Sequence, residues 1–395
     1  MRTFTIHKHN WLAASLVLVL LLSGCSLNRP KAESDQNKPI KINQQQEAQL
    51  TPEERMGQQF TATAKKERPV VKGIYVSAYV TQGKKLDSLL TMMKTHGLNT
   101  MVIDVKSDMG QVMYDSNVNL VNEIGADVNP VIKDPNTLIK SLKDKGIYLI
   151  ARIVVFKDSF MTKKRPEYAM VKKEDGTIWK DRKGARWLNP YKQENWRYNL
   201  DIAKEAVAHG FDEVQFDYVR FPENGKRVDR EVDFGVTDGR SKAETIAAFI
   251  DYAQKELGPH THVSADVFGL TTFTTQDGGI GQDWYKLSPT LDVISPMIYP
   301  SHYNKGFYGI GNPNSQPYAL IKQALSDAIK SNDKLTAQGK KGAVIRPWLQ
   351  DFTAYWIKPV RPYTETDIRE QIKAAHEMGI DEFLLWNSQC KYSFK

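Results

Sequence analysis

Cysteine is almost absent from this chain, which has two among 395 residues, Cys25 and Cys390. The sequence also lacks a Gly-x-Ser-x-Gly nucleophile element and any nucleic-acid-binding motif. Its glycine-rich stretch, residues 271–281, has no phosphate-loop lysine. These absences argue against a disulfide-stapled scaffold, a serine hydrolase, a phosphate-loop enzyme and a nucleic-acid-binding protein. Stability must therefore come from a large hydrophobic core.

Long apolar runs are equally scarce, and the one present lies near the N-terminus. It extends from Trp11 to Leu22 after Arg2 and Lys8, and it is shorter than the roughly 20 residues of a membrane-spanning helix. A basic start followed by such a run is typical of an export signal. The closing residues 22–25 resemble the lipobox of bacterial lipoproteins. We expect residues 1–24 to be a lipoprotein signal peptide, with an ordinary signal or an uncleaved anchor as the alternatives.

Lipidation of Cys25 would decide where the protein works. Two or more acyl chains give stable anchoring, so we expect an extracytoplasmic protein attached to the bacterial cell membrane. Cys390 would then have no disulfide partner. Removal of residues 1–24 takes away Arg2 and Lys8 and lowers the formal charge from +8 to +6. This mild excess favours an anionic envelope or wall polymer, although lysine runs are more often solvated loops.

The stretch after Cys25 is poor in large apolar residues and rich in Gln, Asn, Lys, Glu and Ser. Such a composition cannot bury enough surface to fold alone. We therefore expect residues 25–69 to be a flexible tether, with at most a short helix over 58–66. The folded domain should occupy residues 70–395.

Strand-like and helix-like segments alternate through this domain eight times, which predicts a single (β/α)₈ barrel. The expected strands are 73–79, 100–106, 147–156, 213–219, 262–268, 293–299, 343–347 and 382–387. The expected helices are 86–96, 135–145, 194–209, 242–257, 281–287, 316–329 and 365–378, and too little chain remains for a full eighth helix. Pro296 and Pro347 cannot donate ladder hydrogen bonds, so we expect kinks or bulges in strands six and seven.

Loop lengths orient the barrel. Helix-to-strand links are short and marked by glycine, whereas the strand-to-helix segments 107–132, 157–191, 221–240, 300–315 and 351–364 are long. Long loops at the carboxyl ends of barrel strands are where enzymes of this fold build their sites. We therefore expect the site at that end of the barrel.

Two carboxylates form the best catalytic pair. Asp217 ends strand four, and Asp266 stands near the end of strand five. Neighbouring strands lie about 4.8 Å apart, so two such side chains can flank one glycosidic bond, one as acid and the other as nucleophile or base. Asp212 and Glu213 begin strand four at the other end, which indicates a structural role. A purely structural Asp217, paired with Arg220, is the alternative.

Other polar and aromatic residues at or beside the strand ends suit a sugar ligand. Flat rings with a polar edge pack against sugar faces; Trp187 in its long loop is the better platform, whereas Trp356 and Trp386 should pack in the core. Asp104, beside Lys106 or Arg152, should bind or orient substrate. The predicted substrate-binding residues are Asp104, Lys106, Arg152, Trp187, Arg220, Tyr299, Trp348, Gln350 and Asn387.

Three motifs occur together in order: residues 216–222 (FDYVRFP), 295–300 (SPMIYP) and 346–352 (RPWLQDF). Together they resemble a glycoside-hydrolase domain family of bacterial envelope proteins, over roughly Val71 to Lys395. The resemblance implies a barrel glycosidase whose strand-four acid is Asp217 and whose strand-five acid is Asp266. The corresponding acid in barrel glycosidases is often Glu, so Asp266 departs from that pattern.

The interpretation that follows is a glycoside hydrolase acting on a cell-wall or envelope polysaccharide, with no cofactor. The non-enzyme alternative is a polysaccharide-binding barrel that keeps the groove without a working acid. A metal-dependent deacetylase fits less well, because His260 and His262 lack a third ligand at suitable spacing. No metal site is expected.

Overall fold

Eight stretches of parallel β-strand form a closed ring in the computed structural model, which describes residues 50–274 and 277–394. Neighbours pair in the order β1, β2, β3, β5, β7, β8, β10, β11, and both the β11–β1 and β10–β8 pairings are present, so the ring is complete. The first six are β1 (Lys72–Val76), β2 (Thr100–Lys106), β3 (Tyr148–Val154), β5 (Glu213–Asp217), β7 (His262–Phe268) and β8 (Val293–Ile298). The seventh consists of two pieces, β9 (Val344–Ile345) and β10 (Trp348–Gln350), and the eighth is β11 (Phe383–Trp386). The predicted (β/α)₈ barrel is confirmed.

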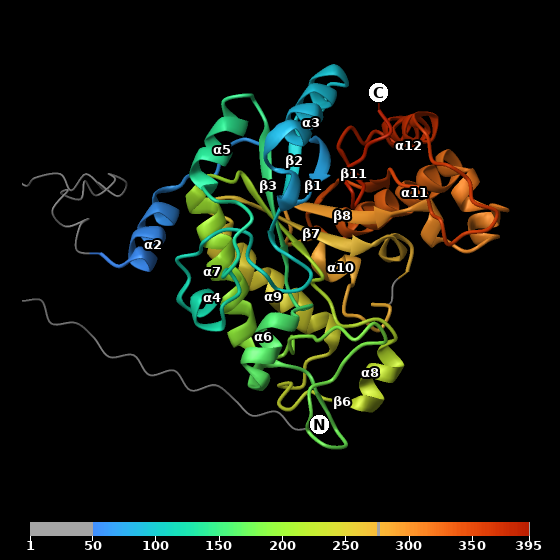
Figure 1. Ribbon diagram of the computed structural model, residues 1–395. Helices are drawn as coiled ribbons and strands as arrows, with labels where there is room; N and C mark the ends of the chain where they lie inside the picture. Colours follow the sequence, from blue (N-terminus) through green and yellow to red (C-terminus); the bar gives the residue numbers. More distant parts are fainter. Residues whose placement is uncertain (1–49, 275–276, 395) are drawn as a thin grey trace, which may run out of the picture. The chain divides into compact units, whose positions relative to one another are not determined.

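Seven helices follow the first seven barrel strands and lie outside them (Figure 1). They are α3 (Gly83–Thr95), α5 (Pro135–Lys143), α7 (Gln193–His209), α9 (Lys242–Leu257), α10 (Trp284–Leu287), α11 (Pro317–Ala337) and α12 (Glu365–Glu377). No helix follows β11 in the described chain up to Phe394.

The local sequence explains where these helices start, stop and pack. In α9, Ser241 and Glu244 form a capping box, a feature worth roughly 0.5–2 kcal/mol. Residues at helical spacing, including Phe249 and Ile250, bury one face of α9. Helix α7 ends at Gly210, whose φ of 108° falls in the left-handed region and suits glycine. The chain then enters β5 directly, which places Asp217 at its carboxyl end.

Strand seven is interrupted where proline was expected to disturb it. It consists of β9 and β10, separated by Arg346 and Pro347. Both pieces keep one register against β8, since Val344 pairs with Val293 and Trp348 with Met297. Pro296 lies inside β8, which remains continuous. The expected disturbance is therefore seen in strand seven alone.

The long strand-to-helix loops carry small elements of their own. They are α4 (Asn119–Ile124), α6 (Ser159–Lys164), the 3₁₀ turn η2 (Pro166–Tyr168), β4 (Val171–Lys172), α8 (Gly225–Glu231) and β6 (Val232–Asp233). Further 3₁₀ turns are η1 (Ala78–Val80), η3 (Gly269–Thr272), η4 (Pro300–His302), η5 (Phe307–Gly309) and η6 (Pro313–Ser315). The antiparallel pairing of β4 with β6 joins the loops that follow β3 and β5.

Part of the expected tether is packed against the barrel. Helix α2 (Pro52–Ala62) contacts α7 and buries Met56 and Phe60, and the Phe60 ring lies 4.4 Å from that of His260. The helix expected over 58–66 is thus present, but it begins at Pro52 and ends at Ala62. Two apolar side chains at helical spacing suffice for docking because α7 presents a complementary face.

The next residues cross the amino ends of the barrel strands. The carbonyl oxygens of Thr63 and Lys66 contact ring nitrogens of His260 and His262. Lys65 forms an ion pair with Asp292 at 2.9 Å, and Arg68 pairs with Glu382. The predicted boundary at residue 70 is therefore placed too late: residues 51–69 belong to the folded unit.

The predicted signal peptide, residues 1–24, and Cys25 lie outside the described residues. Within the described ranges, every helix is too short or too polar to cross a membrane.

Candidate active site

A cavity of about 410 Å³ opens at the carboxyl ends of the barrel strands. Side chains from β3, β5, β7, β8, β10, β11 and the following loops line it. They are Arg152, Lys183, Asp217, Tyr218, Arg220, Glu223, Asp266, Phe268, Gly269, Leu270, Met297, Tyr299, His302, Tyr303, Trp348 and Trp386. The site therefore lies at the end of the barrel that the loop lengths predicted.

Asp217 is held at the cavity by an ion pair and by its own backbone. Its Oδ2 accepts hydrogen bonds from Arg152 Nη2 at 2.5 Å and Nε at 3.0 Å. Its Oδ1 accepts the backbone N–H of Tyr218 at 2.6 Å. Tyr218 has a φ of 49°, a left-handed conformation that is strained for a bulky residue and that concentrates at functional sites. The carboxylate is thus fixed in orientation while it faces the cavity.

Arg152 connects Asp217 to a second carboxylate beneath the cavity. Its Nη1 donates to Asp104 Oδ1 at 2.6 Å, and the Tyr75 hydroxyl donates to Asp104 Oδ2 at 2.5 Å. Burial alone would lower the pKa of Arg152, but the charges of Asp217 and Asp104 outweigh burial and raise it well above its ordinary value. Asp104 is absent from the cavity lining. The predicted substrate ligand instead orients Arg152.

Asp266 is the second carboxyl group of the cavity, on the neighbouring strand. The register that pairs Phe216 with Ala265 places Asp217 and Asp266 at corresponding positions, one residue further on. The Trp348 indole donates to Asp266 Oδ1 at 2.7 Å. Burial, and next the negative charge of Asp217, raise the pKa of Asp266 well above its ordinary value. The two carboxyl groups therefore lie in different environments: Asp217 is ion-paired with Arg152, whereas the raised pKa of Asp266 favours its protonated form.

Aromatic rings form much of the cavity wall, although in a different distribution from the predicted one. Trp386 lines the cavity, with the Arg152 guanidinium 5.4 Å from its ring, and packs edge-on against Trp348 at 5.5 Å. Trp356 is 61% exposed and lies 5.8 Å from the His302 ring of the cavity wall. Trp356 is thus exposed, contrary to the prediction that it packs in the core, whereas Trp386 packs against the core as predicted and also lines the cavity.

Trp187, the predicted sugar platform, is only 2% exposed. Its Nε1 donates to Asp181 Oδ2 at 3.0 Å, and the Arg220 guanidinium lies 5.1 Å from its ring. Arg220 lines the cavity while Trp187 does not. A buried indole at this place supports the arginine and cannot stack on a ligand, so the predicted role of Trp187 is corrected.

Lys106 also lies away from the cavity. The pairing of β2 with β3 shifts register between Asp104 and Lys106, as at a β-bulge, so strict alternation fails. Lys106 is completely buried, where it pairs with Asp158 at 2.8 Å and donates to Asn199 of α7 at 3.0 Å. Its role is structural, because the bulge turns the side chain toward the helix layer.

Gln350 and Asn387 are likewise absent from the cavity lining. The Gln350 side chain accepts from the Ser301 backbone N–H at 3.0 Å and donates to Asn314 and Phe352. Asn387 donates to the backbone carbonyls of Asp351 and Lys391. Both amides satisfy the backbone of the loops around the site, so the prediction that they bind substrate is corrected. The other predicted residues, Arg152, Arg220, Tyr299 and Trp348, do line the cavity.

Sequence reasoning missed several lining residues, including Lys183, Glu223 and His302. Each lies in one of the long strand-to-helix loops, where alternation gives no signal. His302 lies two residues after the motif 295–300, which contains Tyr299. This proximity was the sequence signal that could have indicated its place at the cavity. Burial lowers the pKa of His302, so this ring is neutral at ordinary pH.

The described residues contain no cluster of three His, Cys, Asp or Glu side chains that could hold a metal ion. His260 and His262, considered as metal ligands, contact the carbonyl oxygens of the N-terminal segment instead.

Residues 73–392 match the model of a family described as "Putative glycosyl hydrolase domain". The chain belongs to this family. A crystal structure of a hypothetical protein from Ruminiclostridium thermocellum is 36% identical over 49% of this chain and 97% of its own, with a TM-score of 0.45. The glycoside hydrolase domain of PgaB from Bordetella bronchiseptica is 12% identical, covering 82% of this chain and 95% of its own, with a TM-score of 0.54. No curated protein matches the chain.

Family membership and the barrel identify the chain as a glycoside-hydrolase-like protein. The family predicted from the three motifs and the enzyme class predicted with it are therefore confirmed. The PgaB likeness, at its low identity, bears on the fold alone.

Proposed function

We propose that this protein hydrolyses a glycosidic bond in a polysaccharide of the bacterial envelope, with Asp266 as general acid and Asp217 as nucleophile or base. The observation that carries the proposal is the pair of carboxyl groups on neighbouring strands within one cavity, where Asp217 is ion-paired with Arg152 and where burial and the charge of Asp217 raise the pKa of Asp266. Such pairs divide the acid and base roles in glycosidases.

The chemistry follows from that division. Asp266 gives its proton to the glycosidic oxygen as the bond to the anomeric carbon breaks, so the leaving sugar departs as an alcohol. Asp217, facing the cavity with its charge opposed by Arg152, stabilises the developing positive charge. Asp217 and Asp266 stand on neighbouring strands, whose backbones lie about 4.8 Å apart. A carboxyl separation of about 5 Å would favour a covalent bond from Asp217 to the sugar, later hydrolysed by water, and retention of configuration.

Exposed rings beside the cavity support a polymeric substrate. Tyr299 and His302 line the cavity, and the exposed ring of Trp356 lies next to His302. This aromatic path leads from the cavity to solvent. Stacking on successive sugar faces would extend binding beyond the reacting unit.

The proposed location is the outer side of the cell membrane, through lipid on Cys25. It rests on the apolar run from Trp11 to Leu22 and the following residues 22–25. Metabolic labelling with a palmitate analogue tests it: the natural chain should incorporate label and Cys25→Ala should not. Label in both chains would refute this location.

One observation favours the non-catalytic alternative. Both oxygens of Asp217 already accept hydrogen bonds, from Arg152 and from its own chain, and a fully engaged carboxylate is a poorer nucleophile. A barrel that binds polysaccharide without cleaving it would tolerate such engagement.

Incubation of the purified full-length protein with peptidoglycan and envelope glycans separates the two functions, with new reducing ends and product masses as the readout. Wild type should cleave one glycan, and Asp217→Asn should lose at least about 10³-fold in rate while remaining folded. Asp108→Asn, which removes an exposed acid paired with Lys157, is the matched control. Full activity of Asp217→Asn would remove Asp217 from the mechanism. Glycan binding by both proteins, with no cleavage by either, would establish the binding barrel.

A further inference from the structure

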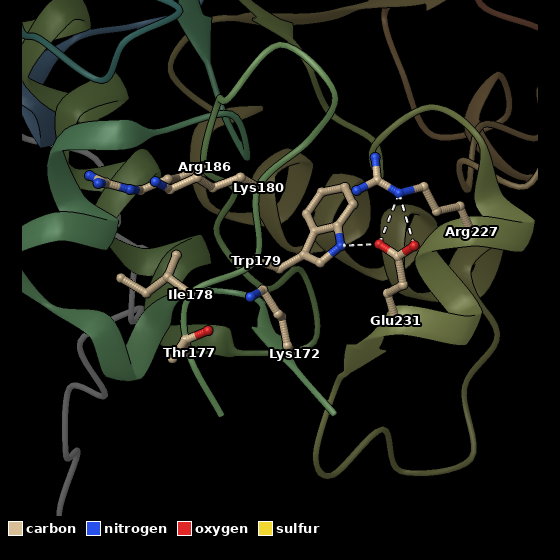
Figure 2. Close-up of a pocket in the computed structure, with 8 residues that line it drawn as sticks. All are labelled: Lys172, Thr177, Ile178, Trp179, Lys180, Arg186, Arg227 and Glu231. Atoms are coloured by element: carbon tan, nitrogen blue, oxygen red, sulfur yellow. Dashed lines mark hydrogen bonds and ion pairs between the residues drawn. The ribbon is translucent and has the colours of Figure 1, made fainter. Parts of the chain in front are cut away.

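A second cavity, also of about 410 Å³, lies in the loops after β3 and β5. Eight residues line it, and we name it the basic cavity: Lys172, Thr177, Ile178, Trp179, Lys180, Arg186, Arg227 and Glu231 (Figure 2). Four cations and one carboxylate give this lining a formal charge of +3. The basic cavity thus carries a net positive charge.

The single acid of the lining is already fully used. Figure 2 shows Glu231 between Trp179 and Arg227, with the indole Nε1 donating to it at 3.0 Å and the guanidinium Nε at 2.8 Å. The hydrogen bond from Trp179, followed by that from Arg227, lowers the pKa of Glu231 to about 2. The same contacts fix Arg227 5.2 Å from the ring of the buried Trp179. Aromatic wall, arginine and carboxylate therefore form one ordered unit.

The remaining cations of the lining have few carboxylates near them. Lys180 and Arg186 stand opposite each other across an antiparallel bridge, and among the described residues neither side chain has a carboxylate partner. Lys172 reaches Asp175 only at 3.6 Å, with both side chains well exposed. Like charges held together in a concave site repel one another, and an anion relieves that repulsion. Arginine and lysine are also the side chains that bind carboxylate and phosphate groups most strongly.

The hairpin that carries these cations also reaches the cavity lined by Asp217 and Asp266, which we call the catalytic cavity. Lys180 and Arg186 form its base, and Lys183 near its tip lines the catalytic cavity. Asp181 braces the turn by accepting the backbone N–H groups of Lys183 and Ala185 at 2.8 and 2.9 Å. Three residues of chain span at most about 10 Å, so the linings of the two cavities come at least this close along the hairpin.

We propose that the basic cavity binds acidic groups of the substrate, so that the polymer cleaved in the catalytic cavity is an anionic polysaccharide bearing carboxylate or phosphate groups. That the bound polymer is also the one cleaved rests on the proposed function. The binding of anionic groups in the basic cavity does not depend on it. Lys183 and Arg220 would continue the same cationic track into the catalytic cavity.

The test is equilibrium binding of three polymers of matched length to the full-length Asp217→Asn protein, in which cleavage does not deplete the ligand. The probes are polygalacturonate, a glycerol-phosphate polymer and neutral dextran. The Lys180→Gln/Arg186→Gln variant should lose at least about tenfold in affinity for one anionic polymer, because two charge-assisted contacts disappear. The affinity for dextran should not change. The two anionic probes distinguish carboxylate from phosphate as the recognised group.

The control removes two charges from elsewhere on the chain. Lys340 and Lys341 are exposed on the link before β9, at the amino end of the barrel, and Lys340→Gln/Lys341→Gln should change affinity less than twofold. Equal losses in the two double variants would overturn the proposal, because overall charge alone would then explain binding. The absence of any preference for the anionic polymers would overturn it too.

Catalysis separates this inference from the proposed function. Cleavage of a neutral glycan at a rate that the Lys180→Gln/Arg186→Gln change leaves unaltered would overturn the anionic substrate and preserve the glycosidase. Anionic binding at the basic cavity without cleavage of any polymer would support the cavity and overturn the glycosidase.

Discussion

The two ends of β5 each carry a buried carboxylate paired with an arginine, and the two pairs differ in nearly everything else. Glu213 opens the strand and pairs with Arg346, with both side chains completely buried. Asp217 closes the strand and pairs with Arg152 at the wall of a cavity. Burial and ion pairing therefore do not distinguish a structural carboxylate from one with a proposed catalytic role. Access to a cavity and the charge of the neighbouring groups do.

The amino-end pair is complete in itself. Arg346 donates to both oxygens of Glu213, and Ser264 and Tyr148 supply further hydrogen bonds. Burial would raise the pKa of Glu213, but Arg346 and these hydrogen bonds outweigh it and lower the pKa. At the carboxyl end, a second carboxyl group, Asp266, stands beside Asp217, and burial together with the charge of Asp217 raises its pKa. One end holds the barrel together, and the other holds two carboxyl groups in unequal environments.

The sharpest test of the contrast is Asp266→Asn. Removing the proton donor should lower kcat by about 10²–10⁴-fold on natural glycans. Wild-type activity should fall as pH rises through the raised pKa of Asp266, and this alkaline limb should be absent from the variant. An aryl glycoside with a good leaving group needs little protonation, so its cleavage should lose much less. The measurement is a pH–rate profile for both substrates.

Equal losses on both substrates would instead assign Asp266 to structure. Folding provides the check. A raised folded-state pKa means that wild type loses stability as pH rises through it, whereas Asn carries no charge. The variant should therefore be at least as stable as wild type at alkaline pH.

Glu213→Gln should act on stability rather than on chemistry. It removes the main counter-charge of the buried Arg346 and leaves only the Glu382 carboxylate, 4.0 Å away, so the expected cost is up to about 3–5 kcal/mol. Chemical denaturation should show this loss, while kcat at low temperature stays within about twofold of wild type. Because the pKa of Glu213 is lowered on folding, its contribution is present above the unfolded-state pKa and is lost as acid takes pH through the folded-state value. A large fall in kcat with unchanged stability would erase the distinction between the two pairs.

The smallest expected effect belongs to Asp104→Asn, which changes a positioning residue. Arg152 would keep only Asp217 as its carboxylate partner and lose part of its orientation, so kcat/KM should fall about tenfold. The loss should lie in kcat rather than in KM, because Asp104 does not line the cavity, and steady-state kinetics on the natural glycan measure it. Tyr75→Phe, which removes only the hydroxyl bonded to Asp104, should give a milder version. An unchanged kcat would mean that Asp104 serves the fold alone.

Periodicity alone was enough to predict the barrel and the end at which its site lies. Strands β2 and β7 and helix α9 begin and end where their patterns indicated, because buried strands and amphipathic helices have strong periods. Asp217 and Asp266 were found because both stand at the end of a regular strand. The catalytic roles of these two residues stay predictions.

The pattern failed where chain geometry departs from regularity. Lys106 follows a register shift that no residue type announces. Trp187 is buried because a loop can fold a tryptophan inward, and Trp386 combines core packing with a place in the cavity wall because it stands at a strand end. Lys183 and His302 reach the cavity from loops whose course depends on tertiary contacts. Composition likewise placed the boundary at residue 70, although Phe60 is buried against the barrel.

The N-terminal segment is attached to one end of the barrel. Residues 63–68 are fixed to the amino ends of the strands through His260, His262, Asp292 and Glu382, on the side of the barrel opposite the catalytic cavity. If the chain is anchored through Cys25, as we propose, the segment that leads from the anchor to the barrel passes the end opposite the cavity. A polymer can then enter the cavity without passing residues 63–68.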